Sequence, residues 1–164
     1  MNFSIFPSTI FATACGGLFL TCSAAISFSF SITLADRALL TSAHDVSEGG
    51  LAVALAECTF GQSTERPIGA TIDASALGLP QARLDLTLFA EQQGTVILSA
   101  PEANVSEIRS LAEAAGCTLT AIGTVGTDRL SIGALLNEPV SSLYAAYSRA
   151  LPEIMEQSEA AAAA

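Results

Sequence analysis

The sequence has few basic side chains. Six Lys and Arg residues together stand against 16 Asp and Glu residues, and the formal net charge is −10 at pH 7. The phosphates of nucleic acids and of anionic membrane surfaces repel such a chain. All six basic residues are arginines, so the chain has no Walker A lysine for a phosphate-binding loop. The composition argues against nucleic-acid and membrane partners and against a P-loop nucleotide site.

Motifs for metal binding by histidine or cysteine and for nucleophilic catalysis are also missing. His44 is the only histidine, which rules out a histidine metal site. The four cysteines show no C-x-x-C pair and no regular spacing, so neither a zinc site nor a disulfide framework is indicated. The G-x-S-x-G and G-x-G-x-x-G motifs of serine hydrolases and dinucleotide-binding enzymes are absent. The sequence therefore predicts no catalytic residue in this chain.

Charged side chains are missing altogether from the first 34 residues, which hold six of the eight phenylalanines. This segment lacks the basic region that begins a secretory signal. Ser, Thr and the Gly16-Gly17 pair interrupt the run of about 20 apolar residues that a membrane-spanning helix needs. We therefore expect residues 1–37 to form a leader that is foreign to the rest of the chain and does not pack on it. A membrane anchor is the less favoured alternative.

Apolar residues make up 51% of the whole chain of 164 residues, which suffices for the core of one domain. Hydrophobic periodicity and the positions of proline and glycine predict helices over 47–59, 84–89, 101–116 and from 138 to about 152. Runs with strand character predict strands over 68–72, 95–99, 117–125 and 129–132, the last two joined as a hairpin by residues 126–128. This order favours an α+β fold, with a mixed or antiparallel sheet covered on one face by helices.

Residues 42–51, Ser-Ala-His-Asp-Val-Ser-Glu-Gly-Gly-Leu, combine oxygen ligands with two glycines at the predicted start of a helix. Ser47 is a common N-cap type, and Gly49 and Gly50 allow a ligand to approach free N–H groups at the positive end of the helix. Beside a phosphate, the carboxylate of Asp45 requires a divalent cation such as Mg²⁺. The stretch indicates a metal-nucleotide site, with Asp45 as metal ligand and Ser47, Gly49 and Gly50 as nucleotide contacts.

The same residues also have a purely structural interpretation. Asp and Ser residues often cap helices, and a glycine pair also serves where two segments pack closely. His44 is expected to be a packing residue whose ring is satisfied by its neighbours. Spacing alone leaves both interpretations of the stretch open.

Three segments carry a resemblance to a known family. Residues 42–60, SAHDVSEGGLAVALAECTF, resemble the opening of the last synthetase-type domain of phosphoribosylformylglycinamidine synthase. Residues 84–99, LDLTLFAEQQGTVILS, resemble a short helix, turn and strand of the same domain, and residues 123–132 resemble its late hairpin. The resemblance covers residues 38–157, which we take as the domain. It leaves out the leader and an Ala-rich tail at 158–164.

The resemblance implies an ATP-dependent, glutamine-dependent ligase that converts formylglycinamide ribonucleotide to the amidine in purine biosynthesis. In that family Asp45 would bind Mg²⁺ and Ser47 would contact bound ATP or ADP. The resemblance also implies a cytoplasmic enzyme in which this chain is a fragment that is inactive alone. Its partners would be the remaining synthetase domains and a glutaminase module or subunit. The alternative is a non-catalytic packing or interaction module derived from that domain.

Overall fold

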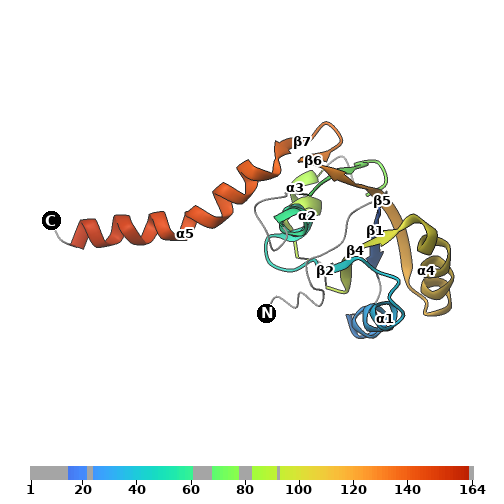
Figure 1. Cartoon of the computed structure of the whole chain (residues 1–164). Helices are drawn as coiled ribbons and strands as arrows, with labels where there is room; N and C mark the ends of the chain where they lie inside the picture. Colours follow the sequence, from blue (N-terminus) through green and yellow to red (C-terminus); the bar gives the residue numbers. More distant parts are fainter. Residues whose placement is uncertain (1–14, 22–23, 61–67, 78–82, 92, 163–164) are drawn as a thin grey trace.

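A computed structural model describes residues 15–21, 24–60, 68–77, 83–91 and 93–162. In this part of the chain, seven strands form one sheet with the order β2-β4-β1-β5-β3-β6-β7, and helices pack around it (Figure 1). The strands are β1 (Cys15–Thr21), β2 (Ser42–Asp45), β3 (Gly69–Ile72), β4 (Thr95–Pro101), β5 (Thr118–Thr127), β6 (Arg129–Ile132) and β7 (Leu136–Pro139). The helices are α1 (Ala24–Asp36), α2 (Gly50–Phe60), α3 (Leu84–Phe89), α4 (Glu102–Ala114) and α5 (Val140–Ala162).

The sheet is mixed, because β3 pairs with β6 in parallel and the other neighbouring strands pair antiparallel. Successive residues of a strand point to opposite faces. On β4, Leu98 packs into a core cluster with Leu34 of α1 and Ile108 of α4, whereas Ile97 packs into a second cluster with Leu51 of α2. The predicted α+β class is confirmed, but the helices lie on both faces of the sheet rather than on one (Figure 1).

The predicted hairpin of residues 117–132 is wrong. Both strands form, but β3 lies between them, antiparallel to β5 and parallel to β6. The chain passes from β5 to β6 across the start of β3, and Gly69 makes room for it. A Cβ atom on Gly69 would collide with the carbonyl oxygen of Arg129. Turn residues at 126–128 therefore predicted a reversal of the chain correctly but not the strand that separates its two arms.

The C-terminal elements also differ from the prediction at their start. Residues 136–139 form β7, paired with β6, so α5 begins at Val140 and not at residue 138. The side chain of Arg129 holds the two strands together by donating from Nε to Oδ1 of Asn137 at 2.7 Å. Pro152 lies inside α5, which continues to Ala162 and leaves the body of the domain (Figure 1). The predicted tail is therefore helical as far as residue 162.

The N-terminal segment does not behave as a foreign leader where the structure describes it. β1 lies between β4 and β5 in the middle of the sheet, and every residue from Cys15 to Thr21 is in register with both neighbours. On α1, Phe30 and Leu34 are 5% and 0% exposed in the same core cluster as Leu98. The expectation that residues 1–37 do not pack on the domain is wrong for 15–21 and 24–36. Residues 1–14 and 22–23 lie outside the described chain.

No helix in the described ranges is both long enough and apolar enough to cross a lipid bilayer.

Candidate functional site

The candidate site lies where β2 ends and α2 begins. β2 is the edge strand of the sheet and pairs with β4, so that Asp45 lies opposite Val96. The next residue, Val46, donates its N–H to Thr95 O at 2.9 Å and is only 4% exposed, which fixes the backbone at this corner. The chain then turns, and the N–H of Gly50 donates to Ser47 O at 3.0 Å. α2 therefore begins at Gly50, three residues after its predicted start.

The two side chains predicted to bind metal and nucleotide are exposed. Asp45 is the last residue of β2, and Ser47 lies in the turn between β2 and α2. Among the described residues, neither side chain has a hydrogen bond or an ion pair. Ser47 thus does not cap α2 through its hydroxyl, although its carbonyl oxygen accepts the first bond of the turn. Both oxygen-bearing groups face solvent at the same corner.

The two glycines differ in their surroundings. Both have a left-handed backbone, with φ of 82° at Gly49 and 71° at Gly50. Gly50 is buried, and a Cβ atom there would lie 2.7 Å from Cα of Phe89 and 2.8 Å from the carbonyl oxygen of Ala90. The close approach at Gly50 is therefore made by the end of α3. Gly49 is exposed, and the three atoms nearest to a Cβ there would all belong to the side chain of Val53.

The corner fits part of a metal site. In the described ranges, no group of three His, Cys, Asp or Glu side chains is placed to hold a metal ion. Mg²⁺ is commonly bound by one or two carboxylates, and phosphate oxygens and water supply its other ligands. The exposed carboxylate of Asp45 meets the first requirement. It suits a metal-phosphate corner completed by other groups, and it does not suit a cage made by the described residues alone.

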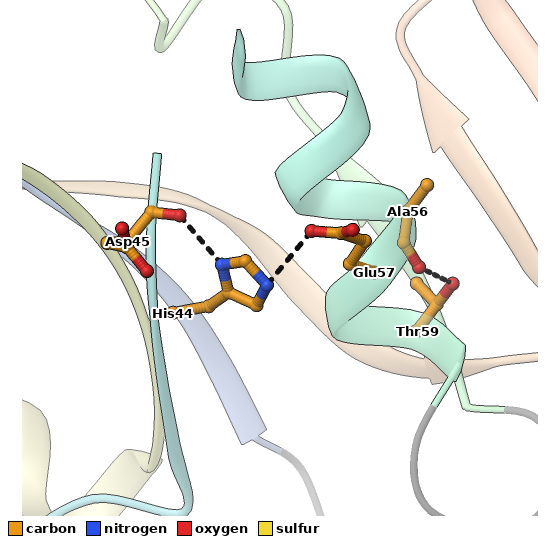
Figure 2. Close-up of polar contacts among 5 residues, drawn as sticks. All are labelled: His44, Asp45, Ala56, Glu57 and Thr59. Carbon is orange, nitrogen blue, oxygen red and sulfur yellow. Dashed lines mark hydrogen bonds and ion pairs between the residues drawn. The ribbon is translucent and has the colours of Figure 1, made fainter. Parts of the chain in front are cut away.

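His44 connects β2 to α2 (Figure 2). Its Nδ1 lies 2.7 Å from the backbone oxygen of Asp45, and its Nε2 lies 3.2 Å from Oε2 of Glu57. The side chains of His44 and Glu57 are 23% and 26% exposed. The prediction that His44 is a satisfied packing residue is confirmed. Nothing in the sequence indicated Glu57 at this site. It lies 12 residues after Asp45, and only the packing of α2 beside β2 brings its carboxylate to the ring of His44.

A groove of about 300 Å³ adjoins the same helix. Its lining is apolar except for Glu57 and the hydroxyl of Tyr147, and comes from α2, the end of α3, β7 and α5. The lining residues are Ala52, Val53, Ala56, Glu57, Phe60, Phe89, Leu136, Leu143 and Tyr147. At one end the ring of Phe60 lies 5.5 Å from that of Tyr144 and 5.2 Å from that of Tyr147, measured between centroids. The amphipathic pattern of α5 was the one signal in the sequence for this surface.

Residues 30–134 match the family model described as AIR synthase related protein, C-terminal domain. A similar curated protein is the phosphoribosylformylglycinamidine synthase subunit PurL of Anaeromyxobacter dehalogenans (strain 2CP-C), which is 38% identical over 130 residues. That match covers 77% of this chain but only 17% of the relative, so the chain spans a small part of the proteins it resembles.

Two solved structures of PurL from T. maritima have a similar fold. The one complexed with ATP has a TM-score of 0.64 at 15% sequence identity, covering 79% of this chain and 25% of that chain. The one complexed with FGAR has a TM-score of 0.63 at 12% identity, covering 79% and 27%. At this level of identity the likeness establishes the fold alone. The family match extends over more than half of the sequence, and the chain therefore belongs to the family of C-terminal domains of AIR synthase related proteins.

Proposed function

We propose that this chain serves as the C-terminal synthetase domain of a phosphoribosylformylglycinamidine synthase, the ligase that uses ATP and glutamine to convert formylglycinamide ribonucleotide to the amidine. The observation that carries the proposal is the 38% identity over 130 residues to a PurL subunit. In this role the domain works in the cytoplasm. It is inactive alone, because the catalytic groups, the other synthetase domains and the glutaminase module belong to the rest of the enzyme.

Within that enzyme, the corner between β2 and α2 contributes one side of a nucleotide site. Asp45 binds Mg²⁺, and Ser47 and the N–H of Gly49 contact the phosphates of ATP or ADP. The exposure of all three residues supports these roles. Mg²⁺ supplies the positive charge that lets a carboxylate lie beside a phosphate. Gly50 acts indirectly, because its missing side chain lets α3 pack against the start of α2 and so fixes the turn that carries Ser47 and Gly49.

A non-catalytic packing module is the second candidate function. Two observations favour it. The space beside Gly50 is occupied by the backbone at the end of α3. Both ring nitrogens of His44 have partners within the chain, Glu57 and the backbone oxygen of Asp45. In that case the stretch 42–51 holds the domain together and binds no ligand. The two functions differ in what Asp45 does, because its exposed carboxylate has no structural task among the described residues.

The test is to replace Asp45 with alanine in an intact synthetase subunit whose C-terminal domain carries residues 38–157. We expect the amount of nucleotide that remains bound to the purified variant to fall by a factor of about ten or more. The loss of a charge-assisted contact costs about 1.5–3 kcal/mol, which corresponds to at least a tenfold change in affinity. Retained nucleotide is measured by chromatography of the denatured protein. Ser47→Ala should change retention in the same direction by less. Both should lower nucleotide retention and thermal stability more than turnover.

Asp128→Ala is the matched control, because Asp128 is also an exposed carboxylate but lies in the turn between β5 and β6. It should leave nucleotide retention unchanged. Full retention in the Asp45→Ala variant would favour the packing module. A loss of turnover at full occupancy would show that Asp45 acts on the reaction and not in nucleotide binding.

A further inference from the structure

One face of α5 is apolar along most of its length. Leu143, Tyr147, Leu151 and Ile154 follow one another at spacings of four, four and three residues, which places them on one side of the helix, with Met155 beside them. Tyr147, Leu151, Ile154 and Met155 are 56%, 65%, 62% and 56% exposed. We call the last three of these the distal stripe. The acidic and basic residues Arg149, Glu153 and Glu156 lie away from this face.

The distal stripe continues the wall of the groove. Leu143 and Tyr147 line the groove, and the next residues of the same helix face, starting with Leu151, extend beyond it. Figure 1 shows this part of α5 leaving the body of the domain. The opposite wall includes Phe89 at the end of α3, which is 60% exposed. One helix face therefore carries a concave apolar surface at its start and a convex apolar surface at its end.

We propose that the groove and the distal stripe form one self-complementary docking surface, and that its occupant is α5 of a second copy of this chain. In a twofold arrangement the two α5 helices cross antiparallel. Each copy then inserts its distal stripe into the groove of the other. An interface of this kind closes on itself and uses the same residues on both sides. This arrangement covers the groove and the distal stripe at once. A partner helix of another sequence would do so only if it carried a similar groove and a similar apolar stripe.

The size of the surface supports a second copy. Phe89, Tyr147 and the distal stripe are each more than half exposed. Because a large aromatic side chain presents about 150–250 Å², we estimate that these five residues together expose on the order of several hundred Å², a large part of the roughly 800 Å² that each partner buries in a standard interface. The net charge of −10 opposes association. However, the charged residues of α5 lie outside the contact, and the one carboxylate in the groove wall, Glu57, is already engaged by His44.

Sedimentation equilibrium of the full 164-residue chain tests this surface. We expect a monomer-dimer equilibrium in the micromolar range that tightens when salt screens the negative charge. Replacing both Leu151 and Ile154 with aspartate should raise the dimer Kd at least about 100-fold, because the carboxylates must lose water in an apolar groove. Ser142→Asp adds a charge to the same helix on the side of Arg149, seven residues before it and away from the stripe, and should change the Kd far less. Circular dichroism checks that the variants keep their helices.

A mixing experiment separates this arrangement from a simple pairing of helices. Phe89→Asp damages only the groove, and Leu151→Asp with Ile154→Asp damages only the distal stripe. Each variant alone should be monomeric, while an equal mixture should form a heterodimer through the one undamaged groove-stripe contact. A wild-type chain that stays monomeric up to submillimolar concentration would overturn the proposal. So would a dimer that is insensitive to Phe89→Asp, because the groove would then have no part in it.

Discussion

Replacing Phe19 with proline should destabilise the domain by at least about 1–3 kcal/mol, which is the cost of leaving one buried carbonyl of the sheet without its hydrogen bond. Phe19 is in the middle of β1, in register with Ile97 of β4 on one side and Thr120 of β5 on the other. Proline has no N–H to donate, and the sheet on both sides of β1 leaves no solvent to replace the lost bond. Because folded domains are stable by only about 5–15 kcal/mol, this loss is large.

Urea unfolding followed by circular dichroism measures the effect, and Phe19→Val is the matched control. Valine removes the same ring but keeps the N–H and suits a strand, so the difference between the two variants isolates the backbone. If β1 is a foreign leader with no place in the sheet, both variants will unfold at the same urea concentration as the unchanged chain. That result would restore the interpretation of residues 1–37 as a separate segment.

Gly50→Ala should destabilise the domain by about 2–5 kcal/mol, which combines a left-handed backbone at a non-glycine residue with overpacking against a rigid neighbour. The φ of Gly50 is 71°, and the new Cβ would lie 2.6 Å from the carbonyl carbon of Phe89. A backbone atom cannot rotate away as a side chain does. The end of α3 must therefore move off α2, and the turn that carries Ser47 moves with it.

Gly116→Ala separates the two contributions. Gly116 ends α4 with a φ of 70°, nearly that of Gly50, and no atom lies within 4 Å of the position its Cβ would take. Gly116→Ala should lower the free energy of unfolding by only about 1–2 kcal/mol, which is the penalty for the left-handed conformation alone. Thermal or urea unfolding of both variants gives the comparison. Equal losses would contradict the close contact between Gly50 and α3.

Helices α2 to α5 and the buried strand β4 were predictable because their signals are local, whereas α1 was not predicted. α3 was predicted at residues 84–89 and is observed there, and α4 follows Pro101 as proline at a helix start indicates. The order of strands was not predictable in this way. β3 lies between β5 and β6, where Gly69 lets β3 approach the backbone of Arg129 and Gly123 lets β5 approach the backbone of Thr71. These contacts join residues that are far apart in the chain. The place of β1 in the sheet was not predictable either, because the composition of this segment resembles a leader more than a strand.

The candidate site was predictable in its residue types but not in its surroundings. The run from 42 to 51 identified the corner and its family, and Asp45 and Ser47 are exposed there. The sequence could not distinguish the two glycines, because the difference arises from tertiary packing: the backbone at the end of α3 lies against Gly50, whereas the side chain of Val53 lies nearest to Gly49. The contact of His44 with Glu57 likewise depends on α2 lying beside β2.

We propose that this domain supplies one side of a nucleotide site that other domains complete. The most direct measurement is a calorimetric titration of MgATP into the isolated chain and into an intact synthetase subunit carrying the same domain. We predict no binding at micromolar concentrations by the isolated chain, and binding by the intact subunit that Asp45→Ala weakens. Micromolar binding by the isolated chain, abolished by Asp45→Ala, would contradict the claim, because the corner between β2 and α2 would then be a complete site.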